Sequence, residues 1–190
     1  MIDLVKKLYW QKYRPKNIDA MILLPRIQKQ LLNSEGQIVL SNNLLLTGSP
    51  GTGKTSLSKI IVPKGALTVN ASYNSSVEDL KDTVIEYCKT GDIFGDNTLD
   101  GFKIVFLDEF DGVSAKYQEA LRGFIEEFAD NCRFILTCNF KNRIIEPLHS
   151  RCGVIDFKFD KKNLAALCGQ FLIRLKDILT TESITFAEPV

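Results

Sequence analysis

The residues best placed to do chemistry lie in a glycine-rich stretch at residues 48–55, which reads Gly-Ser-Pro-Gly-Thr-Gly-Lys-Thr. Glycines here let backbone N–H groups converge on phosphate oxygens without a side chain in the way. The helix expected after the stretch would add unpaired N–H groups and the positive end of its dipole. Lys54 would supply a charge to the β- and γ-phosphates, and the Thr55 hydroxyl would bind Mg²⁺. The stretch therefore predicts a site for ATP and Mg²⁺.

The context of this loop supports the same interpretation. An apolar run at residues 44–46 precedes it and a helical pattern at 54–62 follows it, as in a strand–loop–helix phosphate site. The alternative is a glycine-rich turn that only caps a helix. The expected nucleotide contacts in and after the loop are Gly51, Thr52, Gly53, Lys54, Thr55 and Ser56.

Two acids at the end of a second apolar run form the next candidate. Residues 104–107 are Ile-Val-Phe-Leu, and Asp108 and Glu109 follow them directly. Ligands of open α/β sheets bind at this carboxyl edge. Asp108 would hold Mg²⁺ through water, and Glu109 would accept a proton from the attacking water or orient it. The second acid favours hydrolysis over transfer to another substrate, and the alternative is a solvated turn with two acids.

The elements that must position these residues alternate along the chain. Short apolar runs predict strands at 43–47, 67–69, 103–107, 133–137 and 154–159. Helical spacing predicts helices at 25–33, 54–62, 76–89, 114–128 and 164–179, and glycines and aspartates predict a surface loop at 90–101. This alternation predicts right-handed crossovers and an α/β fold, with a parallel five-stranded sheet between helices.

Composition limits the partners and the compartment. The net charge of +1 over 190 residues gives no global signal for nucleic acid, so such a partner would need a local basic patch. No segment is long and apolar enough to span a bilayer, so no membrane partner is expected. The five cysteines contain no Cys-x-x-Cys pair and indicate free thiols in a reducing cytosol. A metal site at His149 and Cys152 is the alternative.

Four stretches in order resemble an AAA+ P-loop NTPase, and more narrowly a sliding-clamp loader subunit. They are residues 12–15 (Lys-Tyr-Arg-Pro), 48–55, 105–111 and 150–152 (Ser-Arg-Cys), and the resemblance covers about residues 8–184. The residues at 108–111 and 118–122 are most similar to the large subunit of the clamp loader of tailed phages. A viral origin would place the protein in the host cytoplasm.

The resemblance implies further catalytic roles. Asn139, after the strand at 133–137, matches sensor 1, which reads the γ-phosphate and positions water. Arg151 matches the arginine finger that acts in trans on the ATP of a neighbouring subunit. The alternatives are an asparagine that begins a turn and an ordinary surface arginine. The residues that the resemblance places around the adenine are Trp10, Gln11, Lys12, Tyr13 and Ile22. Trp10 and Tyr13 could equally be core aromatics.

Clamp loaders grip primer–template DNA by its backbone, with helix N-termini and basic side chains. The candidate DNA contacts are Ser75, Ser76, Lys81, Lys116 and Arg122. The family often has an arginine early in the first of these helices, and here Glu78 and Asp79 lie there instead, which weakens a direct contact. Lys116 and Arg122 could also be solvated charges. Gln118 matches a residue that couples neighbouring elements to the DNA site, and the alternative is a surface amide.

The resemblance divides the chain into an AAA+ nucleotide-binding core at residues 1–160 and the start of a helical lid at 161–190. A family member has a three-helix lid with a sensor 2 arginine and then a collar domain. The expectation is therefore an incomplete lid without a collar, from a fragment or a split gene, with reduced ATP affinity.

The expected function is an ATP-hydrolysing subunit that opens the DNA polymerase processivity clamp and places it on primer–template DNA during replication. Its partners would be other clamp-loader subunits, the sliding clamp and primer–template DNA. The alternatives are an ATP-binding scaffold without turnover, a small-molecule kinase, and another AAA+ replication ATPase such as a helicase loader or a branch-migration motor. The motif at 150–152 and the two acids at 108–109 argue against the kinase, and the motifs at 12–15 and 150–152 together argue against the last alternative.

Overall fold

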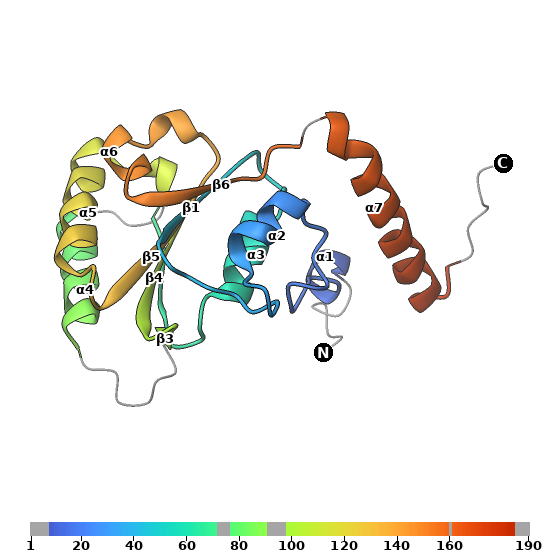
Figure 1. The fold of residues 1–190 in the computed structure, drawn as a ribbon, viewed down its shortest axis with the longest axis horizontal. Helices are drawn as coiled ribbons and strands as arrows, with labels where there is room; N and C mark the ends of the chain where they lie inside the picture. The colour runs from blue at the N-terminus through green and yellow to red at the C-terminus, as the bar shows by residue number, and fades with distance from the viewer. Residues whose placement is uncertain (1–7, 72–76, 91–97, 160, 185–190) are drawn as a thin grey trace. The chain divides into compact units, whose positions relative to one another are not determined.

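The computed structural model describes residues 8–71, 77–90, 98–159 and 161–184 (Figure 1). The chain forms two compact units, residues 25–158 and residues 1–24 together with 159–190. The first of these holds the sheet and the phosphate loop. The second groups the N-terminal segment with the C-terminal helix, a division that the domain prediction did not anticipate. The domain boundaries of 1–160 and 161–190 stay a prediction.

The unit 25–158 is built on a six-stranded sheet. Its strands are β1 (Asn43–Thr47), β2 (Leu67–Asn70), β3 (Thr98–Leu99), β4 (Phe102–Asp108), β5 (Cys132–Cys138) and β6 (Cys152–Asp156). Five strands run parallel in the order β2-β4-β5-β1-β6, and β3 pairs antiparallel with β4. The predicted fold class, a P-loop-type α/β fold with a parallel five-stranded sheet, is confirmed.

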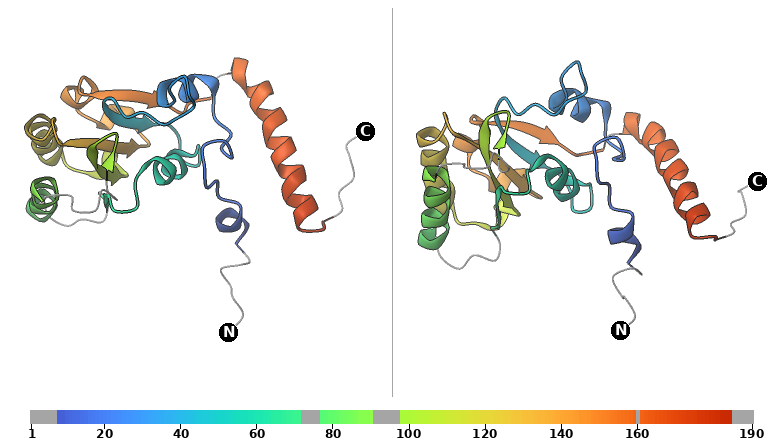
Figure 2. Two further views of the ribbon diagram at one scale, coloured as in Figure 1. Left: turned by 60° about the horizontal axis from the view of Figure 1, so that its bottom comes forward. Right: turned by 90° about the horizontal axis from the view of Figure 1, so that it is seen from below.

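Helices cover both faces of this sheet. They are α2 (Pro25–Leu31), α3 (Lys54–Ile61), α4 (Val77–Lys89), α5 (Ala115–Glu127) and the short α6 (Glu146–His149). In two views α4 and α5 lie side by side on one face, and α2 and α3 lie on the other (Figure 1, Figure 2). The short 3-10 helices η2 (Phe110–Gly112) and η3 (Lys141–Arg143) follow β4 and β5.

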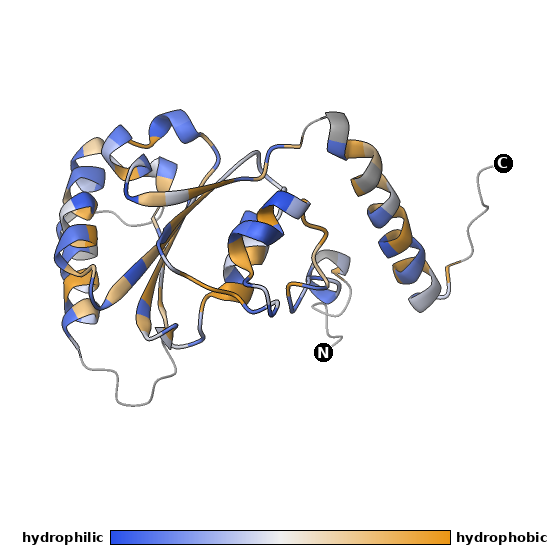
Figure 3. Cartoon of the chain, in the orientation of Figure 1, coloured by the Kyte–Doolittle hydropathy of each residue, from blue (hydrophilic) through white to orange (hydrophobic). Residues whose placement is uncertain are grey.

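The core explains why the central strands are mostly apolar. Five successive residues of β4 and of β5 are buried, because helices cover both faces of the sheet. Figure 3 shows strands that are mostly hydrophobic, whereas α4 and α5 also carry hydrophilic residues. Under α5, Leu121 and Phe124 pack in one cluster with Val105 and Phe134 of the sheet. This packing fixes the carboxyl ends of β4 and β5 relative to each other.

The other unit contains α1 (Tyr9–Lys12) and α7 (Lys161–Thr181). The Lys12 ammonium and the Tyr13 hydroxyl both donate to the Glu182 carboxylate, which follows α7 directly. The two ends of the chain's sequence are therefore tied within this unit. None of the helices described has the length and apolar character needed to cross a membrane.

The structure corrects the predicted bounds of the last strand. The predicted strand was 154–159, but β6 is Cys152–Asp156. The partner strand accounts for the early end, because β1 stops at Thr47, which pairs with Asp156. Beyond this pair, Phe157 N–H donates to the Thr47 carbonyl at 2.7 Å, and the Arg26 guanidinium donates to the carbonyls of Asp156 (2.9 Å) and Lys158 (2.5 Å). Lys158 N–H also turns back onto the Asp156 side chain at 2.8 Å. The alternating pattern in the sequence runs to residue 159, whereas the pairing of β6 with β1 ends at Asp156.

The predicted loop at 90–101 also needs correction in its described part. Thr98 and Leu99 form β3, paired with Lys103 and Phe102 of β4. The turn is Asp100-Gly101, and both residues have positive φ, 54° and 81°. Two such residues are the signature of a tight hairpin turn that matches the twist of its strands. The rest of this loop, residues 91–97, lies outside the described residues. The helix α6 was not predicted either, because four residues give too little periodicity.

Candidate nucleotide site

The glycine-rich loop connects the end of β1 to the start of α3. Gly48, Gly51 and Gly53 have φ values of 147°, 80° and 101°, a region that side chains disfavour. A Cβ on Gly48 would lie only 2.8 Å from the Cβ of Phe157, so only glycine fits between loop and sheet there. Gly53 is the N-cap of α3 and provides no side-chain cap. The first N–H groups of α3 therefore face the loop, as a phosphate site requires.

Lys54 is held under the loop. Its side chain is 6% exposed, and its ammonium donates to the carbonyls of Gly48 (2.6 Å) and Ser49 (2.9 Å). Burial lowers the pKa of Lys54 below its ordinary 10.5, and the nearby Cys138, Asp111 and Asp108 oppose this shift. The ammonium is thus positioned among the loop's backbone groups, where it can pair with an anion bound by the loop.

The Thr55 hydroxyl and the Asp108 carboxylate meet beside this loop. Thr55 Oγ1 donates to Asp108 Oδ1 at 3.3 Å, which joins the first turn of α3 to the end of β4. Hydroxyl and carboxylate oxygens are the hard ligands that Mg²⁺ prefers. The predicted metal ligands therefore lie together and fit Mg²⁺ in chemistry and in position.

Sequence reasoning missed Thr137, which contacts the Asp108 carboxylate and the backbone of Glu109. Its hydroxyl donates to Asp108 Oδ1 and accepts from the backbone N–H of Glu109 at 3.0 Å. Glu109 is exposed and has a φ of 55°, one of three non-glycine residues with positive φ in the described chain. In the sequence, Thr137 looks like an ordinary β-branched strand residue. The available signal was a lone hydroxyl at the end of an apolar strand, and the structure places that strand next to the acidic one.

Asn139 lies at the same edge of the sheet as Asp108. It follows β5, the direct neighbour of β4, and its side chain is half-buried. The loops after these two strands are also joined, because Phe140 N–H donates to Asp111 Oδ2 at 3.1 Å. This places Asn139 where a γ-phosphate sensor would lie. Its sensor role stays a prediction.

Arg151 lies away from this group of residues, immediately before β6. Its Nε donates to Glu126 Oε1 at 2.8 Å, its Nη2 donates to the same oxygen, and its Nη1 donates to the Pro147 carbonyl at 2.7 Å. Asn43 Nδ2 holds the Arg151 carbonyl at 3.2 Å. Asn43 is the first residue of β1, whereas the phosphate loop follows the last one. Arg151 is therefore at the amino edge of the sheet, opposite the phosphate loop.

The residues predicted around the adenine belong to the other compact unit. Gln11 and Lys12 are exposed on α1, and Tyr13 and Ile22 are half-buried. Lys12 and Tyr13 contact Glu182, as described above. Trp10 is in α1, and its side chain is outside the described part of the structure. The adenine contacts stay predictions.

The candidate DNA residues fall on α4 and α5. Ser75 and Ser76 lie outside the described residues, and Lys81 is exposed on α4. Lys116 Nζ on α5 lies 3.8 Å from Glu78 Oε1 on α4, so the first turns of these two helices are neighbours. Arg122 pairs with Glu119 at 3.1 Å, one turn away on α5. Lys116 and Arg122 thus have acidic neighbours, and the contact of all these residues with DNA is untested.

Gln118 is not a surface amide, because only 2% of it is exposed. Its Nε2 donates to the Arg143 carbonyl at 3.0 Å, and its Oε1 accepts from Ile145 N–H at 2.8 Å. The side chain thus joins α5 to the segment between β5 and α6. That segment leads directly to Arg151.

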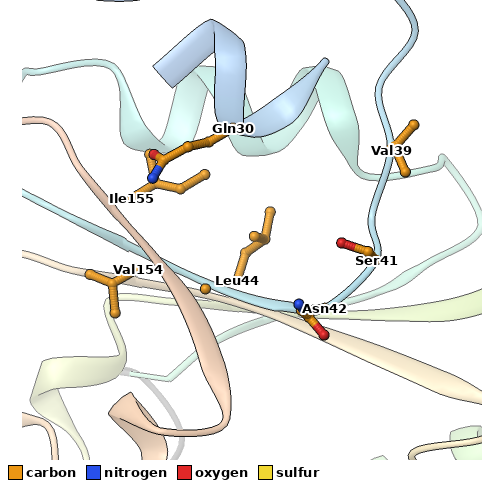
Figure 4. A pocket seen from close by; sticks show the side chains of 8 residues that line it. Gln30, Val39, Ser41, Asn42, Leu44, Val154 and Ile155 are labelled. Carbon is orange, nitrogen blue, oxygen red and sulfur yellow. The ribbon is translucent and has the colours of Figure 1, made fainter. Parts of the chain in front are cut away.

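A separate pocket of about 170 Å³ opens between α2 and the strands β1 and β6 (Figure 4). Its lining residues are Gln30, Val39, Ser41, Asn42, Leu44, Gly153, Val154 and Ile155. None of them carries a charge that could pair with phosphate. This pocket is therefore distinct from the nucleotide site.

A parallel sheet, a glycine-rich loop and a Thr–Asp pair at its carboxyl edge together define a P-loop nucleotide-binding domain. The family model of the AAA proteins, the ATPase family associated with various cellular activities, matches residues 44–160. That match covers more than half of the sequence, so the chain belongs to the AAA family.

Two curated relatives make the comparison more specific. The replication factor C small subunit of Archaeoglobus fulgidus is 34% identical over 90% of this chain and 56% of its own length. The replication factor C small subunit of Methanococcus vannielii is 33% identical over 95% of this chain and 56% of its own length. The chain thus spans about half the length of the curated relatives it matches.

The solved structures agree on the fold. The Thermotoga maritima RuvB Holliday junction branch migration motor matches with a TM-score of 0.54 at 24% identity, over 78% of this chain and 49% of that one. A point variant of the same motor, with alanine in place of an arginine, gives a TM-score of 0.57 at 22% identity, over 86% and 55% of the two chains. At this level of identity the likeness supports the fold alone.

Proposed function

We propose that this chain is the nucleotide-binding core of an ATP-hydrolysing clamp-loader subunit. It would act with other subunits to open the sliding clamp of a DNA polymerase and place it on primer–template DNA. The relatives named replication factor C small subunit support this proposal over other AAA activities. The observation that carries it is the separation between Arg151 and the phosphate loop.

The strand register gives the size of that separation. Asn43 of β1 pairs with Cys152 of β6, and Thr47 pairs with Asp156. Asn43 and Thr47 are four strand steps apart at about 3.3 Å each, which puts roughly 13 Å between the two edges of the sheet. Arg151, which precedes Cys152, is too far from the loop of its own chain to contact a nucleotide there. An arginine finger at this position would serve the ATP of a neighbouring subunit, as ring-forming loaders require.

The chain's own residues would divide the reaction as follows. The loop N–H groups and Lys54 would hold the β- and γ-phosphates, and Thr55 and Asp108 would hold Mg²⁺. Mg²⁺, when bound, neutralises charge that develops on the phosphates. Glu109 orients the attacking water, and Asn139 contacts the γ-phosphate.

The finer features of the proposal rest on the resemblance alone. The motif residues at 108–111 and 118–122 favour the large subunit of the tailed-phage loader, although the relatives described above are archaeal small subunits. Residues of the N-terminal segment would surround the adenine. Lys81, Lys116 and Arg122 would contact the DNA backbone, and the protein would act in the cytoplasm.

The test measures ATP turnover by this chain with its partner subunits, the clamp and primer–template DNA. We expect clamp and DNA together to stimulate turnover. Glu109→Gln should lower it by about 10²–10⁴-fold, the usual effect of losing a general base, and leave ATP affinity nearly unchanged. Glu35→Gln, in an exposed turn outside the candidate site, is the matched control.

Three other outcomes would reject the proposal in different ways. ATP binding without turnover under all conditions would indicate the scaffold. Turnover that ignores both clamp and DNA would indicate another AAA activity. Phosphorylation of a small acceptor would indicate a kinase.

A further inference from the structure

One hydroxyl group connects the two acids at the end of β4. Thr137 lies on β5, is 2% exposed, and contacts both Asp108 and Glu109. A threonine hydroxyl has a single proton to donate. Since the Asp108 carboxylate can accept but not donate, that proton points to Asp108, and the lone pairs of the oxygen receive the N–H of Glu109. The direction of both hydrogen bonds is therefore fixed.

The same network includes the phosphate loop. Asp108 Oδ1 accepts from Thr137 on one side and from Thr55 on the other, the latter at 3.3 Å. The hydrogen bonds connect the Glu109 backbone to Thr137 and Thr137 to Asp108. Asp108 in turn is bonded to Thr55 in the first turn of α3. Hydrogen bonds in such a chain polarise and strengthen one another in a buried environment. The carboxylate is thus held from two directions before any ligand binds.

The backbone of Glu109 needs this support. Its φ of 55° lies in the left-handed region, which is costly for a residue with a Cβ and persists only where the surroundings enforce it. The bond from Glu109 N–H to Thr137 restrains the amide of this residue, and Gly112 N–H donates to its carbonyl at 3.0 Å. A Glu109 that relaxed to negative φ would aim its side chain elsewhere.

We propose that Thr137 is a positioning residue that sets the Asp108 carboxylate for Mg²⁺ and the Glu109 side chain for the attacking water. This inference rests on the proposed ATP hydrolysis at this site. Threonine suits the task better than serine, because its branched Cβ restricts χ1 and the strand buries its methyl group. Valine has the same shape but lacks the hydroxyl.

The first measurement is the binding of a fluorescent ATP analogue to the full chain, once with Mg²⁺ and once with EDTA. The ratio of the two dissociation constants reports how well Asp108 serves the metal. We expect Thr137→Val to shrink this ratio by about 10-fold, as loss of an outer-shell partner typically does. We expect Thr137→Ser to stay within about threefold of the native chain, and affinity in EDTA to stay unchanged.

A double-mutant cycle separates positioning from a general structural defect. If Thr137 acts through Asp108, then Thr137→Val adds no further loss of the Mg²⁺ effect in an Asp108→Asn background. A general structural defect would instead lower the Mg²⁺ effect by the same factor in the native chain and in the Asp108→Asn chain. Melting temperatures of all variants check the fold, and Thr137→Ala replaces the valine variant if the latter does not fold.

The second measurement is turnover with partner subunits, clamp and DNA. Thr137→Val should lower kcat by about 10–100-fold with little change in KM, and Thr137→Ser should restore most of it. A native Mg²⁺ ratio in the valine variant, or losses that add to those of Asp108→Asn, would overturn the inference. If the native chain shows no turnover, the proposed function fails, and the binding ratio and the cycle still decide the role of Thr137.

Discussion

Two buried lysines show how the same residue type can serve structure or function. Lys103 is 7% exposed, and its ammonium donates to the carbonyls of Tyr87 (2.8 Å) and Thr90 at the end of α4. It therefore neutralises the negative end of a helix. Lys54 is 6% exposed, and its ammonium donates to the carbonyls of Gly48 and Ser49. These carbonyls belong to the phosphate loop and not to the carboxyl end of a helix. Burial lowers its pKa, so its charged form costs free energy in the folded chain.

This contrast predicts opposite effects of two matched substitutions. Lys54→Met should lower ATP affinity by about 100-fold, because two charge-assisted bonds to phosphate are lost, and should leave the melting temperature unchanged or higher. Lys103→Met should cost about 1–3 kcal/mol of stability and leave the nucleotide affinity of the folded chain intact. Nucleotide titration and urea unfolding of both variants check this. A Lys54→Met variant that is less stable than Lys103→Met would contradict the assignment.

The loop and its acids could be predicted from sequence because local patterns determine them. Glycine spacing fixes the residues at 48–55, and an apolar run fixes the strand end at Asp108. Thr137 could not be assigned in this way, since its partners lie on another strand and only the parallel register brings them together. The ends of β6 were missed for the same reason, because they coincide with the ends of its partner strand β1, which lies far earlier in the sequence.

At the scale of elements, helix α5 contacts both the segment at 143–145 and Arg151. Its residue Gln118 holds the segment at 143–145, and its residue Glu126 holds Arg151. Both contacts come from one helix, about two turns apart, so α5 is the element that sets where Arg151 lies. The sequence predicted a helix at 114–128, and the structure has it at Ala115–Glu127. The structure adds the cap, because the Ser114 side chain accepts from Tyr117 N–H at 3.3 Å.

Loss of Gln118 should loosen the contact between α5 and the segment at 143–145. Gln118→Ala leaves the Arg143 carbonyl and the Ile145 N–H without their partner, and each unsatisfied buried group costs about 1–3 kcal/mol. We expect a loss of about 2–4 kcal/mol in urea unfolding. Gln170→Ala, on an exposed position of α7, is the control and should stay within about 0.5 kcal/mol. Equal stability of the two variants would show that the bridge is absent in solution.

The stability of the unit that contains α1 and α7 should fall at acid pH. Hydrogen bonds from Lys12 and then Tyr13 lower the pKa of Glu182 below its ordinary 4.5. Because the folded pKa is the lower one, the contact stabilises fully above pH 4.5 and is lost as the pH falls below that value. The melting temperature should therefore differ between the native chain and Glu182→Gln at neutral pH. The difference should vanish well below pH 4.5, and one that persists there would contradict the ion pair.

At the scale of the whole molecule, the residues proposed to act in catalysis lie at opposite edges of one sheet. Lys54, Thr55, Asp108 and Glu109 gather at the carboxyl edge, and Arg151 lies at the amino edge beside Asn43. The Arg151 guanidinium is paired with Glu126 of its own chain. Both side chains are partly exposed, so this pair contributes at most about 1 kcal/mol and would not prevent Arg151 from engaging a neighbour's phosphate.

The most direct test of this arrangement mixes two variants that should each be inactive. Glu109→Gln lacks the residue proposed to orient water, and Arg151→Ala lacks the proposed arginine finger. If the finger acts in trans, a mixed assembly contains sites where an intact Glu109 meets an intact Arg151 from the adjacent subunit. ATP turnover with clamp, primer–template DNA and partner subunits should then be much higher for the mixture than for either variant alone. A mixture as inactive as its components, or an Arg151→Ala chain with native turnover, would contradict a shared active site.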